Sequence, residues 1–164
     1  MGAPPDRIRI LFVCLGNICR SPTAEVVFRA AAQRAGLGPR LQVDSAGTGE
    51  WHTGSPPDYR AIAHAAKRGY DLKPLRARQV SIADFDRFHW ILAMDGSNLD
   101  HLQAMRPPDF GGHLGLFLEL APQLELREVP DPYDGGPEGF ERMLDLIERG
   151  SEAFAAKLVE SLAR

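Results

Sequence analysis

The segment that most constrains the fold is a short apolar run that leads through a tight loop into a helix-like segment. Residues 7–14, RIRILFVC, are typical of a strand that is buried on both faces of a sheet. Residues 22–35 carry apolar side chains at helical spacing, and Ser21 is a good N-cap in front of a proline at the first helical position. We therefore expect a buried strand followed at once by a helix, which is the repeating unit of α/β sheets.

The remainder of the chain alternates between strands and helices in the same manner. Further strands are expected at 41–43, 89–94 and 114–118, further helices at 58–69, 97–105 and 140–162 with Gly150 as a weak point, and loops at 51–57 and 130–139. Ser81 and Asp84 resemble a capping box that opens one more short helix. This alternation predicts a parallel α/β sheet, and because no linker or repeat divides residues 1–164, we expect a single domain.

The composition excludes several classes of protein. The 164 residues carry a formal net charge of -3, which removes the electrostatic basis for general binding to nucleic acid or to an anionic membrane. The apolar runs are shorter than a membrane span, and residues 1–10 lack the layout of a secretory signal. Cys14 and Cys19 are the only two cysteines, so we expect no disulfide framework and a cytoplasmic protein with reduced thiols. The histidines form no recognised metal-site motif, and no metal is assigned to them: His52, His64, His89, His101 and His113.

The loop between the first strand and the first helix has the composition of an anion site. A short loop that curls around one point aims its backbone N–H groups inward, and the helix N-terminus adds partial positive charge there. Gly16 and Asn17 are the residues best able to adopt the left-handed backbone conformation that such a loop needs. The residues expected to surround the anion are Cys14, Leu15, Gly16, Asn17, Ile18, Cys19, Arg20 and Ser21.

Three side chains of this loop carry chemistry suited to a tetrahedral dianion. Arg20 has a planar fork that can hold two phosphate oxygens at once. Cys14 stands at the carboxyl end of a strand, where ligands of open α/β sheets bind, and positive surroundings lower the pKa of a thiol. Ser21 can donate a hydrogen bond to the sulfur. We therefore expect Cys14 to act as a nucleophile without a separate base.

A second candidate group lies far along the chain, on the loop at 130–139. Asp131 stands between Pro130 and Pro132, which restrict the backbone around it. A carboxylic acid placed over the anion site could protonate a departing phenolate and, as a carboxylate, could then activate water. Taken alone, an Asp-Pro pair is mostly a turn signal, so the assignment of Asp131 depends on the loop that begins at Cys14.

Six short stretches, in this order, resemble low-molecular-weight protein tyrosine phosphatases. They are CLGNICRSP at 14–22, DSAGT at 44–48, PPDYRA at 56–61, RARQ at 76–79, MDGSNL at 94–99 and DPYDG at 131–135. The resemblance covers nearly the whole chain and implies a four-stranded parallel sheet flanked by helices, with a phosphate-binding loop between the first strand and the first helix. It implies a phosphotyrosine protein or a small aryl phosphate as substrate, inorganic phosphate as product, and neither a metal nor a cofactor.

The resemblance also implies roles for individual residues. Cys14 would form a phosphocysteine, Arg20 would clamp the phosphate, and Asp131 would serve first as the acid and then as the base. Asn17 would organise the loop through Ser21 and Ser45, and Trp51 and Tyr133 would wall an aromatic slot beside the phosphate.

The sequence departs from this family pattern at two positions. Leu75 stands where many members have a histidine that supports the loop asparagine, so the loop must lean on other groups. Asp134 follows Tyr133 where many members have a second tyrosine, which adds a negative charge near the mouth of the site.

Other interpretations remain open at the level of sequence. An arsenate reductase on the same scaffold would relay disulfides through further cysteines, which this chain lacks. A phosphocarrier would hold phosphate on cysteine but needs neither Arg20 nor Asp131, and a phosphotyrosine-binding module needs no aligned thiol and acid.

Single residues also allow more than one interpretation. Cys19 is either a small loop residue or a partner that forms a disulfide with Cys14, which a thiol reductant would reopen. Trp51 either contacts substrate or covers the core edge, Trp90 is expected in the core, and Arg76 and Arg78 are expected on a solvated or salt-bridged face.

Overall fold

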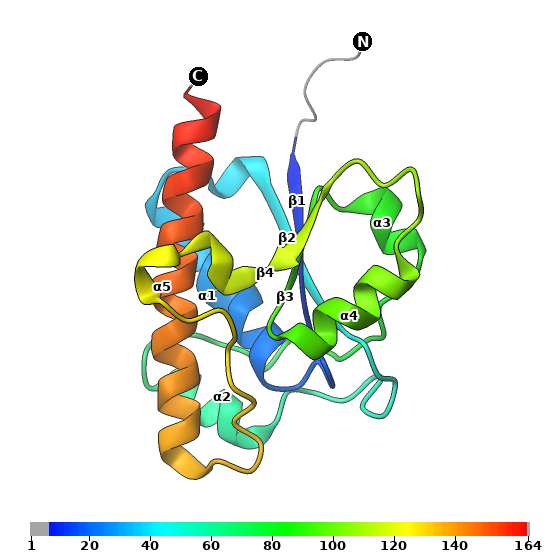
Figure 1. The fold of residues 1–164 in the computed structure, drawn as a ribbon. Coiled ribbons are helices and arrows are strands. Elements are labelled where there is room, and N and C mark those ends of the chain that lie inside the picture. The colour runs from blue at the N-terminus through cyan, green and yellow to red at the C-terminus, as the bar shows by residue number, and fades with distance from the viewer. Residues whose placement is uncertain (1–6, 164) are drawn as a thin grey trace.

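The computed structural model describes residues 7–163, which form an α/β arrangement with one central sheet (Figure 1). The strands are β1 (Ile8–Cys14), β2 (Leu41–Gly47), β3 (Trp90–Ala93) and β4 (His113–Leu116). All pair in parallel, in the order β2-β1-β3-β4, which confirms the four-stranded parallel sheet. The strand β1 therefore lies inside the sheet, and Cys14 stands at its carboxyl end.

Helices cover both faces of the sheet (Figure 1). They are α1 (Arg20–Arg34), α2 (Tyr59–Ala66), α3 (Ala83–Arg87), α4 (Gly96–Met105) and α5 (Gly136–Leu162). In Figure 1, α1, α2 and α5 lie on one side of the sheet, and α3 and α4 lie on the other. Two layers of helices bury both faces of β1, which explains its continuous apolar sequence.

The side chains of β1 alternate between two cores. Ile10 and Phe12 belong to the core beneath α1 and α5, where Phe12 meets the Phe28 ring edge-on at a centroid distance of 5.7 Å. Leu11 and Val13 belong to the smaller core beneath α3 and α4. Truncation of a fully buried phenylalanine to alanine costs about 3–5 kcal/mol. This packing therefore anchors β1 firmly, and with it the position of Cys14 at the end of the strand.

Several element boundaries differ from those expected. The strand at 41–43 continues to Gly47, and β4 ends at Leu116 because residues 117–120 turn into a 3₁₀ helix, so the strand expected at 114–118 is shorter. The long helix begins at Gly136 rather than at residue 140, since the proline that follows is well tolerated in a first helical turn. Gly150 is no weak point: a Cβ atom there would lie 2.8 Å from the Phe117 ring, so glycine allows α5 to approach the core.

Two further expectations can be compared with the described residues. Trp90 is half-buried and packs edge-on against Phe154, with ring centroids 5.0 Å apart. One of the two hydrogen bonds of a capping box is present at Ser81, whose backbone N–H donates to Asp84 Oδ2 at 2.8 Å. The expectation about a secretory signal concerns residues 1–10, of which residues 1–6 lie outside the described range. Within residues 7–163, no helix is long and apolar enough to cross a membrane.

Candidate active site

The loop that joins β1 to α1 runs from Cys14 to Arg20, the first residue of the helix. Asn17 has a φ of 57°, so it adopts the left-handed conformation expected of it. Gly16 does not adopt a positive φ; its lack of a side chain serves a close approach instead, since a Cβ atom would lie 3.0 Å from His52 Cδ2. The expectation of a left-handed residue is therefore confirmed for Asn17 and wrong for Gly16.

Three carbonyl groups of the loop accept hydrogen bonds from neighbouring segments. The Cys14 and Leu15 carbonyls accept hydrogen bonds from the N–H groups of Thr48 and Gly49, each at 2.9 Å. The Ile18 carbonyl accepts one from the N–H of Asp58, also at 2.9 Å. Within residues 7–163, no hydrogen bond is recorded from the backbone N–H groups of residues 15–19, which leaves these donors for an anion.

Gly47, at the end of β2, is a site residue that sequence reasoning did not single out. A Cβ atom there would lie 2.7 Å from the Leu15 carbonyl oxygen and 3.1 Å from the Asn17 nitrogen. The neighbouring strand can therefore approach the loop only because this position has no side chain.

The Asn17 side chain holds the loop through three hydrogen bonds. Its amide nitrogen donates to Ser21 Oγ at 2.8 Å and to Ser45 Oγ at 3.0 Å, so the expected contacts are present. Its amide oxygen accepts from the backbone N–H of Arg78 at 3.0 Å. The loop asparagine is thus bonded at both donors and at its acceptor although Leu75 replaces a histidine.

A buried carboxylate extends this network away from the site. Ser45 Oγ donates to Glu25 Oε1 at 2.7 Å, and Arg29 Nη2 donates to Glu25 Oε2 at 2.7 Å. Burial raises the pKa of Glu25, while the hydrogen bonds from Arg29 and Ser45 oppose that rise. Glu25 lies within α1, and nothing in the helical pattern of residues 22–35 indicated that its side chain would support the loop.

The Cys14 sulfur lies at the base of the site, beside the first turn of α1. It is 3.0 Å from Ser21 Oγ and is nearly inaccessible to solvent except through the pocket. Because Asn17 donates to Ser21 Oγ, the hydroxyl proton is available for the sulfur or for the Ala46 carbonyl at 3.3 Å. Ser21 is therefore not the N-cap expected from the sequence: α1 begins at Arg20, and the serine hydroxyl serves the loop.

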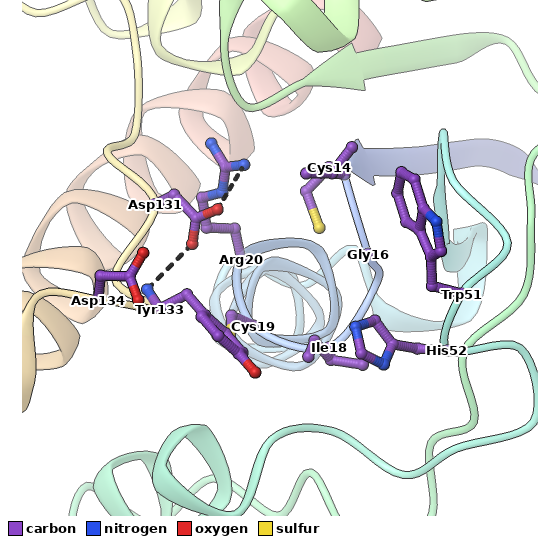
Figure 2. Close-up of a pocket in the computed structure, with 11 residues that line it drawn as sticks. Cys14, Gly16, Ile18, Cys19, Arg20, Trp51, His52, Asp131, Tyr133 and Asp134 are labelled. Carbon is purple, nitrogen blue, oxygen red and sulfur yellow. Dashed lines mark hydrogen bonds and ion pairs between the residues drawn. The ribbon is translucent and has the colours of Figure 1, made fainter.

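The Arg20 guanidinium is held rigidly beneath the site. Its Nη1 donates to Asp95 Oδ2 at 2.7 Å and to the Val129 carbonyl at 2.9 Å. Its Nη2 lies 3.7 Å from Asp131 Oδ2 (Figure 2). Asp95 also caps α4, because its Oδ1 accepts from the Asn98 N–H at 2.8 Å. The stretch that contains Asp95 was noted in the sequence, but its contact with Arg20 was not foreseen.

A pocket of about 390 Å³ opens above the sulfur. Figure 2 shows Trp51 and His52 on one side of Cys14 and Asp131 and Tyr133 on the other. Trp51 and Tyr133 are 71% and 47% exposed, so both present their rings at the mouth rather than in the core. The pocket is lined by Cys14, Leu15, Gly16, Ile18, Cys19, Arg20, Trp51, His52, Asp131, Tyr133 and Asp134.

The structure thus brings together most of the site residues expected from the sequence. Asn17 and Ser21 do not line the pocket but support it from behind, whereas His52 lines it and was not expected to. Arg76 and Arg78 lie away from the pocket, and Arg78 forms ion pairs with Asp44 at 2.9 Å and with Asp84 at 3.0 Å.

Comparisons with known proteins identify the family of this arrangement. The family model described as low molecular weight phosphotyrosine protein phosphatase matches residues 9–164. The low molecular weight phosphotyrosine protein phosphatase of Schizosaccharomyces pombe is 47% identical over 134 residues, which are 81% of this chain and 85% of that protein. The low molecular weight protein-tyrosine-phosphatase YfkJ of Bacillus subtilis is 41% identical over 151 residues, 92% of this chain and 96% of its own. The chain belongs to this phosphatase family.

A solved structure supports the same assignment for this low-molecular-weight phosphatase. A protein tyrosine phosphatase from Entamoeba histolytica, crystallised with Hepes in its active site, superimposes with a TM-score of 0.90. The two are 37% identical, and the match covers 94% of this chain and 99% of the other. The fold expected from the sequence is therefore confirmed.

The second cysteine of this phosphatase loop is in a different environment from the first. Cys19 is buried beside α1, and burial, followed by the negative charge of Asp58, raises its pKa far above the usual thiol range. The Cys19 thiol is therefore protonated at neutral pH. Within residues 7–163, no group of three or more His, Cys, Asp or Glu side chains is placed to hold a metal ion.

Proposed function

We propose that this protein hydrolyses aryl phosphate monoesters, with phosphotyrosine in proteins as the substrate class, through a phosphocysteine on Cys14. The observation that supports this most is the placement of a thiol and a carboxyl group on one pocket: Cys14 at its base and Asp131 at its mouth. Between them, the unbonded N–H groups of residues 15–19 provide a ring of donors for phosphate oxygens.

In the first step, the phosphate occupies this ring and the Cys14 sulfur, as a thiolate, attacks phosphorus. A sulfur–phosphorus bond forms, the bond from phosphorus to the phenolic oxygen breaks, and the carboxylic acid of Asp131 gives its proton to the departing oxygen. Arg20 holds two of the equatorial oxygens, and Asp95 fixes the orientation of that guanidinium at 2.7 Å.

In the second step, the Asp131 carboxylate takes a proton from water, and the water oxygen attacks phosphorus. The sulfur–phosphorus bond breaks and inorganic phosphate is released. The sulfur leaves as a thiolate, and the Ser21 hydroxyl at 3.0 Å stabilises it by donating a hydrogen bond. Removal of Asp131 should therefore slow both steps, whereas removal of Cys14 should prevent the first.

The walls of the pocket favour an aromatic leaving group. Trp51 and Tyr133 present rings on opposite sides of the sulfur, and such a pair can sandwich a phenyl ring of the substrate (Figure 2). A phosphoserine would place only a short aliphatic chain between them. The alternatives of arsenate reduction and phosphate transfer do not require this aromatic slot, and a module that only binds phosphotyrosine does not require Asp131 beside the thiol.

The experiment that tests the proposal is a hydrolysis assay with aryl phosphate, phosphotyrosine peptide and phosphoserine peptide. Cys14→Ser should abolish turnover and still bind phosphate, because a hydroxyl is a poor nucleophile without a base. Asp131→Asn should slow phenyl phosphate by about 10²–10⁴-fold and a nitrophenyl ester far less, because only the poor leaving group needs the proton. Equal slowing of both esters would argue against Asp131 as the acid.

We also propose that the protein acts in the cytoplasm, where a thiol reductant can reverse oxidation of the site. Peroxide would convert the Cys14 thiolate to a sulfenic acid, and the Cys19 sulfur would displace hydroxide to form a disulfide that a dithiol reopens. The raised pKa of Cys19 makes the displacement slow at neutral pH and faster as pH rises. After peroxide and then dithiothreitol, wild type should recover more activity than Cys19→Ser. Equal recovery would show that Cys19 does not protect the site.

A further inference from the structure

The PPDYRA stretch at 56–61 has no role in the mechanism, yet its arginine connects two parts of the site. Asp58 is the N-cap of α2, and its Oδ1 accepts from the backbone N–H of Arg60 at 2.8 Å. The same carboxylate binds the Arg60 fork, with Nε to Oδ1 and Nη2 to Oδ2 both at 3.1 Å. The guanidinium plane is therefore fixed by two bonds along one edge, which leaves its flat faces free.

This guanidinium lies over aromatic rings of the segment that follows Asp131. The guanidinium carbon of Arg60 is 5.1 Å from the centroid of the Tyr133 ring and 5.0 Å from that of Phe140. Both distances lie within the range of cation–π contacts. Tyr133 walls the pocket, whereas Phe140 is fully buried at the start of α5. Arg60 thus contacts both an exposed ring on a loop, Tyr133, and a buried ring of a helix, Phe140.

The other end of this unit is attached to the phosphate loop. The Asp58 N–H donates to the Ile18 carbonyl at 2.9 Å, so the residue that fixes the Arg60 guanidinium is itself bonded to the phosphate loop. Tyr133 in turn donates its N–H to Asp131 Oδ1 at 3.0 Å. A continuous series of contacts therefore runs from the phosphate loop through Asp58 and Arg60 to the wall of the pocket.

We infer that Arg60 is a positioning residue that holds the Tyr133 ring beside the phosphate site and so sets the affinity for the aromatic part of a substrate. The inference rests on the proposed function, because it assigns the ring to substrate recognition. Arg60 does not line the pocket above Cys14, and Asp58 already balances its charge. Its loss should therefore weaken binding of aryl ligands and leave binding of the bare anion unchanged.

The test measures binding, so that it does not depend on turnover. Dissociation constants of benzylphosphonate and of inorganic phosphate are determined by calorimetry for wild type and Arg60→Gln. Arg149→Gln, which changes an exposed arginine of α5, is the matched control. We expect Arg60→Gln to weaken benzylphosphonate by about 2- to 5-fold, the range of an exposed cation–π contact, with phosphate unchanged. The control should alter neither constant.

A double-mutant cycle tests whether Arg60 acts through the Tyr133 ring. In Tyr133→Leu, Arg60→Gln should have no further effect on benzylphosphonate, whereas in Tyr133→Phe, which keeps the ring, the full effect should remain. If Arg60→Gln fails to fold, Arg60→Leu replaces it with the same expected result, weaker binding of benzylphosphonate and unchanged binding of phosphate, because leucine carries no cation. The capping hydrogen bond to Asp58 comes from the backbone of residue 60 and is retained in each variant.

Steady-state kinetics provide a second measurement of the effect of Arg60→Gln on aryl binding. For an aryl phosphate, Arg60→Gln should raise KM by the factor seen for benzylphosphonate and leave kcat unchanged. Equal weakening in the Tyr133→Leu background, or loss of phosphate affinity in the same proportion, would overturn the inference. So would unchanged benzylphosphonate affinity in Arg60→Gln. A wild-type protein that binds benzylphosphonate but shows no turnover would refute the proposed function alone.

Discussion

Substitution of Ser45 by alanine tests how the phosphate loop is held without a histidine at position 75. The Ser45 hydroxyl accepts from Asn17 at 3.0 Å and donates to Glu25 at 2.7 Å, and all three side chains are buried. Alanine leaves one amide N–H of Asn17 and one oxygen of Glu25 without these partners. A buried polar group left unpaired costs about 1–3 kcal/mol, and the Glu25 oxygen is the more expensive of the two.

The expected destabilisation is therefore about 3 kcal/mol if the neighbouring groups relax only partly. In a domain of this size, that loss lowers Tm by about 6–12 °C. The loop should also become less well ordered, because Asn17 must keep its left-handed conformation with one support fewer. We expect weaker competitive inhibition by phosphate and a lower kcat for aryl phosphates.

Ser151→Ala is the matched control. Ser151 is fully buried in α5, and its Oγ has no hydrogen-bond partner within residues 7–163. Removal of an unpaired buried hydroxyl should be neutral or stabilising. The free energy of unfolding in urea and the inhibition constant of phosphate are measured for both variants and for wild type. If Ser45→Ala is as stable as Ser151→Ala and binds phosphate like wild type, Ser45 does not hold the loop.

The cost of Ser45→Ala should also depend on pH. Burial raises the pKa of Glu25, so the folded protein binds this proton more tightly than the unfolded chain, and stability falls as pH rises through the folded-state pKa. The Ser45 hydrogen bond favours the ionised form and limits that fall. Without it, the loss of stability relative to wild type should grow with pH above the wild-type Glu25 pKa. A constant difference across that range would contradict the assignment of Glu25.

Two further predictions concern the mouth of the pocket. A Cβ atom on residue 49 would lie 1.9 Å from Trp51 Cζ3, so Gly49→Ala should displace the indole. We expect KM for aryl phosphates to rise about 2- to 5-fold and inhibition by phosphate to stay unchanged. Tryptophan fluorescence reports the displacement, and an unchanged KM would show that Trp51 does not contact substrate. Asp134 adds a carboxylate to the pocket wall, so wild type should have a higher kcat/KM for a phosphotyrosine peptide flanked by lysine than for one flanked by glutamate. Asp134→Asn should reduce the ratio of these two kcat/KM values by about 2- to 5-fold at low salt. An unaltered ratio would show that Asp134 does not select substrates.

The residues that could be predicted from the sequence are those whose chemistry is local. Cys14 and Arg20 lie on one short loop, and the order of strand, loop and helix fixes where that loop must stand. The flanking prolines made Asp131 a candidate and the resemblance implied its role, but its distance to Arg20 could not be predicted, because it depends on the whole intervening chain. The same local signals also misled: Ser21 before a proline indicated an N-cap, but its hydroxyl is used by Cys14 and Asn17.

The support from Ser45 was predicted only through the resemblance, and the support from Asp95 was not predicted, because both contacts depend on sheet register. Cys14 pairs with Gly47 across the sheet, which places Ser45 two residues back along β2, where its hydroxyl reaches Asn17. On the other side, Val13 pairs with Ala93, so β3 ends beside the loop and Asp95 lies two residues after its end. No periodicity within either segment reports these neighbours.

The order of the strands explains why the supports come from both sides. The chain passes from β1 to β2 on one side and only later to β3 on the other, so the crevice for ligands opens at the carboxyl end of β1. Residues after β2 and within its end hold the backbone of the loop, and a residue after β3 holds the guanidinium that completes the site. The ring of donors and the charged clamp are therefore fixed by separate strands. Damage to the Ser45 side should weaken the ring while the ion pair between Arg20 and Asp95 keeps the clamp in place.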